Sequence, residues 1–270
     1  MVVKRGWSGA SAGVAASAVG VALLLSGCGG GDGTVSVAPP SSHASASAPT
    51  GSASRPTAST TTDNGAIPSA ISLIHTARAT DAKATSAHLV MRMTAPDGSK
   101  QVIDIRGTVD GSNQQATTQD DSDGTATIRT VSGNDYVRGN QAFWQKQAKM
   151  PATEAGLLEN KWILASPTAA SSLELPTIDQ LLDDVLGPKN ITDNSLKVAT
   201  VTRSTLNGVA VYVINANDGS GDTITVSADG KATPLRMAGS DDGPISITMD
   251  GWNTQAPITA PSGAINQPTV

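Results

Sequence analysis

The feature that most constrains the fold of this 270-residue chain is a series of Asp-Gly dipeptides. Three of these aspartates, Asp97, Asp110 and Asp123, are spaced by 13 residues. That spacing accommodates a strand of about nine or ten residues plus a turn. Asp-Gly tolerates the positive φ angles of tight hairpins, so the spacing predicts an antiparallel meander. Further Asp-Gly pairs lie at 218–219, 229–230, 242–243 and 250–251, and an Asn-Gly pair lies at 207–208.

Apolar and polar residues alternate between these turns. In 88–94, Leu89, Met91 and Met93 face one way, and in 101–109 so do Ile103 and Ile105. Period two with one polar face predicts antiparallel strands that cover a core on one side. We expect eight to ten strands in all, with the later ones at 196–201, 209–215, 222–227, 234–237 and 244–249.

Two segments have helical periodicity instead. Residues 68–85 are apolar at helical spacing, and Pro68 suits a first helical turn. Residues 178–186 form the stronger prediction, because Thr177 and Gln180 make a Thr-x-x-Gln capping box and Gly187 and Pro188 stop the helix. One face of that helix is apolar. The sequence therefore predicts one α+β domain over 67–270, with two or three helices.

The N-terminus resembles a bacterial lipoprotein signal. Lys4 and Arg5 precede an uncharged stretch from Ala10 to Leu25, which is too short for a comfortable membrane span of about 20 residues. Leu25-Ser26-Gly27-Cys28 resembles the lipobox, which implies a signal peptide over 1–27 and palmitate-type acyl chains on Cys28. The alternatives are an ordinary signal peptide with a chance cysteine, or an N-terminal anchor helix. The lipobox implies anchoring to the outer face of the cytoplasmic membrane.

Residues 28–66 lack apolar periodicity and are rich in Ser, Thr and Pro, so they are predicted to be a disordered stalk after the lipidated cysteine. The whole chain has a formal net charge of −5, and removal of 1–27 would leave −7. This balance argues against nucleic acid as a partner. A single cysteine excludes an internal disulfide and a multi-cysteine zinc site.

No catalytic or metal site is predicted, and no cofactor. His75 and His88 are the only histidines in the predicted domain, and no G-x-S-x-G elbow accompanies them. The stretch "QDDSDG" at 119–124 fails as a calcium loop, because Gln119 and Thr130 stand where acidic ligands belong. We therefore expect a protein that is not an enzyme.

The order of these features resembles the LppX/LprG-type envelope lipoproteins of actinobacteria, within the LolA/LolB-like superfamily. Three stretches carry the resemblance: "NDYVRGNQAFWQK" (134–146), "ENKWILAS" (159–166) and "ISITMDGWNTQAPITAPSG" (245–263). It implies a half-open β-barrel whose concave face is covered by helices, with a cavity that binds lipid or acyl chains. Segment 113–119, rich in Gln and Thr, departs from a strand that lines a lipid pocket.

Candidate cavity residues follow from the apolar strand faces, the capped helix and the aromatic cluster. The same apolar faces would also build a closed core, and the aromatic residues would also form a local plug. The alternative function is accordingly a cell-surface sensor or protein-interaction module with a filled core. The cavity candidates are Leu89, Met91, Met93, Ile103, Ile105, Trp144, Trp162 and Leu182.

Overall fold

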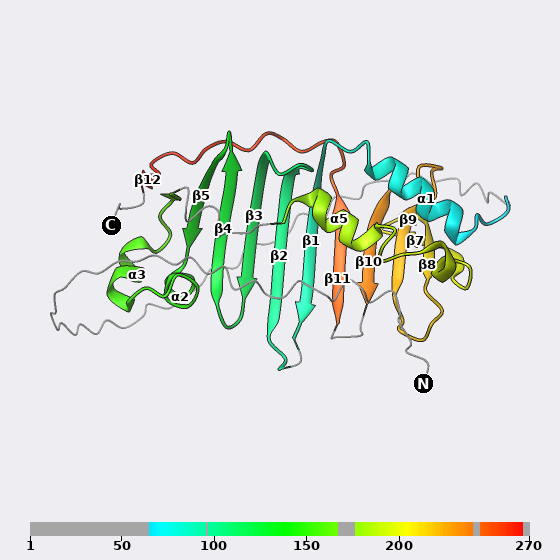
Figure 1. Ribbon diagram of the computed structural model, residues 1–270, viewed down its shortest axis with the longest axis horizontal. Coiled ribbons are helices and arrows are strands. Elements are labelled where there is room, and N and C mark those ends of the chain that lie inside the picture. Colours follow the sequence, from blue (N-terminus) through cyan, green and yellow to red (C-terminus); the bar gives the residue numbers. More distant parts are fainter. Residues whose placement is uncertain (1–64, 96, 167–175, 240–243, 267–270) are drawn as a thin grey trace, which may run out of the picture. The chain divides into compact units, whose positions relative to one another are not determined.

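The computed structural model describes residues 65–95, 97–166, 176–239 and 244–266. The predicted signal peptide, Cys28 and nearly all of the predicted stalk lie outside these residues. The described chain is an α+β fold built on one open sheet (Figure 1). Its strand order is β12-β6-β5-β4-β3-β2-β1-β11-β10-β9-β8-β7, and all pairs are antiparallel except β12 with β6. The predicted fold class, with an open antiparallel sheet and helices on one face, is confirmed.

The first half of the sheet is the predicted meander. Turns at Gly98, Gly111 and Gly124, all with positive φ, join its first four strands, so the Asp-Gly signal is confirmed there. A turn at Ser132 and Gly133, also with positive φ, leads into β5. Segment 113–119 lies in β3 despite its polarity. These strands are β1 (Ser86–Thr94), β2 (Lys100–Thr108), β3 (Asn113–Asp120), β4 (Gly124–Val131), β5 (Asn134–Gly139) and the short β6 (Ile163–Leu164).

The second half is another meander, and its last strand pairs with the first strand of the domain. Strand β11 lies between β10 and β1, with Leu89 opposite Met249. The Asn207-Gly208 turn has positive φ at both residues, as a tight hairpin requires. The predicted turn at 242–243 lies outside the described residues. The strands are β7 (Thr200–Leu206), β8 (Val209–Asn215), β9 (Thr223–Ser227), β10 (Pro234–Gly239) and β11 (Ile245–Asp250).

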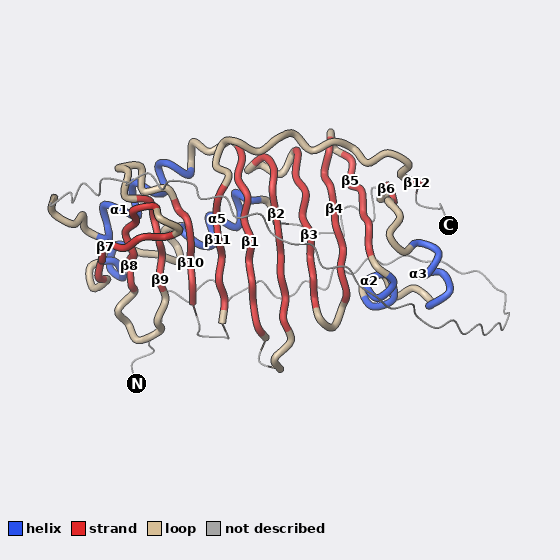
Figure 2. The backbone as a smooth tube through the Cα atoms, turned by 180° about the vertical axis from the view of Figure 1, so that it is seen from behind, coloured by secondary structure: helices blue, strands red, loops and turns tan. Residues whose placement is uncertain are grey.

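After β11 the chain runs back along the strand ends of the first meander to β12 (Ile265–Asn266), as both views show (Figures 1 and 2). Asn113 fixes this segment in both directions. Its side-chain Nδ2 donates to the backbone carbonyl oxygen of Ile258 (2.8 Å), and its Oδ1 accepts from the backbone N–H of Ile258 (2.7 Å). Strand β12 then pairs with β6, so the C-terminal segment links the middle of the sheet to its far edge.

The helices pack against one face of the sheet in two groups. Helices α1 (Ala70–Asp81), α5 (Ile178–Leu186) and α6 (Asp193–Leu196) cover the strands around β1 and β8 to β11 and share one hydrophobic cluster with them. Helices α2 (Gln141–Lys146) and α3 (Ala152–Leu158) close a smaller cluster over β4, β5 and β6.

Both predicted helices are confirmed. Helix α1 begins after Ser69, whose side chain caps it. Helix α5 has the predicted capping box, in which Thr177 Oγ1 accepts from the Gln180 amide (3.1 Å) and Gln180 Oε1 accepts from the Thr177 amide (2.9 Å). All five apolar side chains on its predicted face are buried, namely Ile178, Leu181, Leu182, Val185 and Leu186.

Three expectations about the elements are wrong. The described residues contain five helices, where two or three were expected. The expected strand at 196–201 is instead the end of α6 followed by β7, because Thr192 and Ser195 form a second capping box that starts a helical turn. The expected strand count is also too low, since twelve strands lie within the described ranges. The aromatic stretch in 134–146 continues from β5 into α2, which Asn140 caps by accepting from the Phe143 amide (2.9 Å).

Candidate functional site

The helix-facing side of the sheet carries a continuous apolar row that crosses seven strands. Leu89 lies opposite Met249 on one side and Ile105 on the other. The row continues through Ala116 of β3 to the second cluster. Cross-strand partners share a face, so these side chains all point toward the helices. In order, the row is Met249, Leu89, Ile105, Ala116, Ile128, Val137 and Ile163, and every member is buried.

The neighbouring row is rich in methionine and less completely covered. Met237 lies opposite Ile247, which lies opposite Met91, which in turn lies opposite Ile103. Met91 and Met237 are buried, but Ile103 is only partly buried. One step further along the strands, Met93 lies opposite Ile245, and both are partly buried. The apolar layer therefore opens toward solvent at this end of β1, β2 and β11.

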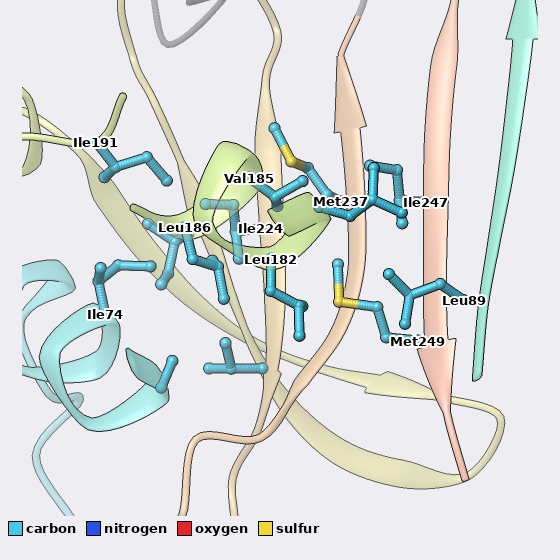
Figure 3. Packing of buried hydrophobic residues seen from close by; sticks show 14 of the residues in the cluster. Ile74, Leu89, Leu182, Val185, Leu186, Ile191, Ile224, Met237, Ile247 and Met249 are labelled. Atoms are coloured by element: carbon cyan, nitrogen blue, oxygen red, sulfur yellow. The ribbon is translucent and has the colours of Figure 1, made fainter. Parts of the chain in front are cut away.

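Helix α5 places Leu182 over this layer. Figure 3 shows Leu182 and Val185 of α5 on the side nearer Met237 and Met249, and Leu186 nearer Ile74 and Ile224. All of these side chains belong to one buried cluster. Of the predicted cavity residues, Leu89, Met91, Ile105 and Leu182 lie buried in this one cluster, and Met93 and Ile103 pack at its margin. The structure thus brings six of the eight candidates together.

The two tryptophans lie elsewhere. Trp144 belongs to the smaller cluster, where its Nε1 donates to the carbonyl oxygen of Gly139 (3.1 Å) and its ring meets Phe143 edge-on at 5.1 Å between centroids. Trp162 lies beneath the guanidinium of Arg129, 4.8 Å from the ring centroid. Neither ring joins the cluster that contains Leu182.

Gln114 is the buried polar side chain that β3 places on the helix-facing side. It is 3% exposed, and its Nε2 donates to the carbonyl oxygen of Pro176 (3.1 Å), just before α5. Its Oε1 has no hydrogen-bond partner among the described residues. The polarity of β3, noted from the sequence, therefore enters the interior at one position at the end of the strand.

Both histidines of the described residues pair with aspartates. His75 of α1 contacts Asp193 of α6 at 2.8 Å, and both side chains are more than half exposed. His88 of β1 lies between Asp250 of β11 (Nδ1 to Oδ1, 2.7 Å) and Asp104 of β2 (Nε2 to Oδ1, 3.3 Å). His88 therefore joins the two meanders on the outer face of the sheet, away from the helices.

Asp81 at the end of α1 is a carboxyl group with a perturbed pKa. Burial raises its pKa to about 6, and the nearby carboxylates of Asp179 and Asp183 on α5 contribute to this rise from the ordinary value of 3.8. Three acidic groups thus meet where α1 and α5 approach each other. Within the described residues, no set of three or more His, Cys, Asp or Glu side chains could hold a metal ion.

The outer face also carries a groove that the sequence analysis did not identify. It has a volume of about 570 Å³ and crosses β1, β2 and β3. Arg92 and Arg106 line it together with Gln115, Thr117 and Gln119. The alternation of apolar and polar residues in the sequence already placed these five side chains on the polar face of their strands. Only the register between strands shows that they converge.

Within the described residues, no helix is both long enough and apolar enough to cross a bilayer.

Comparisons with known proteins give similarity in fold alone. No family model matches the chain, and no curated protein sequence matches it significantly. Among solved structures, the lipoprotein LppX of Mycobacterium tuberculosis is similar at a TM-score of 0.40 and 15% identity, over 70% of this chain and 98% of that one. An uncharacterized conserved protein from Thermus thermophilus gives 0.31 and 6%, over 73% and 99%. MucB, solved in complex with MucA(peri), gives 0.30 and 11%, over 72% and 57%.

Proposed function

We propose that this chain is a non-enzymatic envelope lipoprotein, anchored through Cys28, whose apolar layer between sheet and helices binds a lipid acyl chain. The anchor rests on the sequence: a positive start at Lys4 and Arg5, a short apolar stretch, and small residues before Cys28. Two acyl chains suffice for stable anchoring. The Ser/Thr/Pro-rich segment up to residue 66 would then act as a tether for the domain.

One observation carries the acyl-chain assignment, namely the concentration of methionine in the helix-facing layer. Four of the chain's six methionines, Met91, Met93, Met237 and Met249, lie on this face of β1, β10 and β11. Methionine is unbranched and adaptable, and it is favoured at surfaces that must fit flexible apolar partners. A core that needs only one packing arrangement is better built from Leu, Ile and Val.

The partly buried margin supplies an entry point. Met93, Ile103 and Ile245 pack against the cluster but keep some exposure. An acyl chain that lies along this margin would bury its own methylenes at about 0.8 kcal/mol each. It would also cover side chains that water now contacts. Deeper insertion requires α5 to move outward, because Leu182 is 1% exposed in the present packing.

The histidines support a structural role rather than catalysis. His75 joins α1 to α6, and His88 joins β2, β1 and β11. Each imidazole contacts an aspartate carboxylate on a neighbouring helix or strand. We therefore propose no reaction for this protein.

A second candidate function is a sensor or protein-interaction module with a filled core. The nearly complete burial of Leu89, Met91, Ile105 and Leu182 favours it, because such packing needs no ligand. The two proposals differ in what the margin does. In the first, Met93 and Ile103 contact an acyl chain, whereas in the second they are the edge of a closed core.

The test places a charge at the margin. We expect Ile103→Lys to abolish co-purification of lipid with the full chain, as measured by solvent extraction and mass spectrometry, because a buried ammonium repels an apolar chain. Thr248→Lys, on the outer face of β11, is the matched control and should retain lipid. If wild type and both variants carry no lipid, or if Ile103→Lys carries as much as wild type, the filled-core module is the better account.

A further inference from the structure

The outer face of the first meander concentrates positive charge in an acidic chain. Arg106 of β2 lies opposite Gln115 of β3, which lies opposite Arg129 of β4. Arg138 of β5 lies on the same face, opposite Thr127 of β4. Arg92 of β1 lies further along the strands. The face that carries these side chains has no described helix on it, as the view from behind shows (Figure 2).

The arginines line two adjoining hollows. The 570 Å³ groove is lined by Arg92 and Arg106, and a smaller hollow of about 190 Å³ by Arg106 and Arg129. Both share Gln115 and Gln255, so Arg106 stands between them. The combined space is within the range of about 300–1,000 Å³ that is usual for small-molecule sites.

The guanidinium groups that line the groove are not held in ion pairs by the described residues, although the carboxylate of Asp104 lies in the same groove. No carboxylate in the described part of the chain lies within ion-pair distance of Arg92 or Arg106. The groove's acidic residue, Asp104, contacts His88, which is also bound to Asp250. Arg129 has neutral partners only: its Nε donates to Gln115 Oε1 (2.8 Å) and its Nη1 to the Thr259 carbonyl oxygen (3.2 Å). Burial, followed by repulsion from Arg106 and Arg138, lowers the pKa of Arg129.

The other groups in the groove suit a hydroxylated ligand. Thr117 and Gln119 offer hydroxyl and amide groups, and Val90 and Val102 add aliphatic surface beside them. A guanidinium fork matches the oxygen atoms of a phosphate, and uncharged donors and acceptors match the hydroxyls of a polyol. A peptide is a poorer fit. The strands that form the groove are paired on both sides, so none offers an edge to an extended chain.

We propose that this groove binds a polyol phosphate of the glycerol phosphate type, either free or as the headgroup of an anionic lipid. Arg106 contacts the phosphate oxygens, Arg92 adds positive charge four residues further along β1, and Gln115, Thr117 and Gln119 bind the hydroxyls. The site lies on the opposite face of the sheet from the acyl-binding layer and does not depend on it.

The test uses the mature chain from residue 28 with Cys28→Ser, because an acylated cysteine or the apolar segment 1–27 would itself insert into vesicles. Calorimetry measures binding of sn-glycerol 3-phosphate and of inorganic phosphate, and co-sedimentation measures binding to phosphatidylglycerol and phosphatidylcholine vesicles. We expect Arg106→Gln to weaken binding about tenfold, the loss of one charge-assisted contact. Arg236→Gln, an exposed arginine on the same face of β10 outside the groove, is the control and should leave affinity unchanged.

Each outcome either tests the proposed site or shows whether its ligand is a soluble molecule or a lipid headgroup. Binding of free glycerol phosphate that depends on Arg106 supports a soluble ligand, and Arg106-dependent binding to phosphatidylglycerol vesicles alone supports a lipid headgroup. Equal losses in Arg106→Gln and Arg236→Gln would indicate diffuse charge and overturn the site. So would the absence of binding to every probe, or tighter binding to polyglutamate than to glycerol phosphate. Both arginines are exposed, so unchanged melting temperatures should show that the variants fold.

Discussion

Arg78 of α1 holds the end of α5, because its Nε donates a 2.6 Å hydrogen bond to the carbonyl oxygen of Leu186. Its Nη2 also donates to the carbonyl oxygen of Ile191 (2.5 Å), beyond the helix. The last carbonyl groups of a helix lack partners within it, so a guanidinium at this position satisfies them. One side chain thereby ties α1 and α5 together over the sheet.

Replacing this arginine should loosen α5. We expect Arg78→Met to lower the free energy of unfolding by about 2 kcal/mol, because two carbonyl groups lose a charged donor. In a domain of this size, that corresponds to a decrease in melting temperature of roughly 4–8 °C. Arg78→Lys keeps the charge but loses the two-donor geometry of the guanidinium. Its free energy of unfolding should lie between those of wild type and Arg78→Met. Equal stability of all three proteins by thermal unfolding would mean that the contacts contribute nothing.

The capping box of α5 gives a second test. Thr177→Ala should cost about 1 kcal/mol, since the Gln180 amide loses its acceptor. Thr177→Ser retains the hydroxyl and should stay near wild type. Chemical denaturation measures both variants. A wild-type midpoint for Thr177→Ala would show that packing alone sets the start of this helix.

Gly107 in β2 tests the close approach of two strands. Its φ is +134°, and a Cβ atom there would lie 2.1 Å from the carbonyl oxygen of Asn113. We expect Gly107→Ala to cost about 3 kcal/mol, because both the backbone conformation and the contact become unfavourable. Gly98→Ala is the control. Gly98 also has positive φ but has no atom within 4 Å of the added carbon, so it should cost only about 1 kcal/mol. If Gly107→Ala and Gly98→Ala lower the free energy of unfolding equally, the close contact with Asn113 contributes no steric penalty.

Asp81 gives a pH dependence with a defined sign. Its folded-state pKa, about 6, lies above the ordinary value of 3.8, so the fold binds its proton more tightly than the unfolded chain does. The resulting stability is fully present below about pH 3.8 and is lost as the pH rises through about 6. Asp81→Asn should therefore be more stable than wild type at pH 8, by about 1 kcal/mol after allowance for partial exposure.

The same comparison at pH 4 should show a much smaller difference between Asp81→Asn and wild type. Asp184→Asn is a matched control, because Asp184 is exposed on α5 and is not among the carboxylates that act on Asp81. Urea denaturation at both pH values supplies the measurement. A variant that gains as much stability at pH 4 as at pH 8 would contradict the raised pKa.

The sequence predicted those elements whose signals are local. Asp-Gly turns, alternation in β1 and β2, and the Thr177 box on α5 each depend on neighbouring residues. The short α6 was missed although Thr192 and Ser195 form the same kind of box, because Ser at the third position is a weaker signal than Gln. The pairing of β11 with β1 spans more than 150 residues and has no local signature.

The candidate site was predictable only in part for the same reason. Alternation placed Leu89, Met91, Met93, Ile103 and Ile105 on one face, and α5 supplied Leu182 above them. Trp162 could not be placed, because its side of the sheet depends on how the two-residue β6 pairs with β5. The groove around Arg106 was missed because its residues come from three strands and meet only through register.

Native mass spectrometry of the full chain, isolated from membranes in mild detergent, tests the central claim most directly. The account predicts a mature chain that begins at a diacylated Cys28 and carries one further, non-covalent lipid, which is released on collisional activation. A chain observed only at its covalent mass, with no bound lipid in wild type or in the Thr248→Lys control, would contradict an acyl-binding layer between sheet and helices.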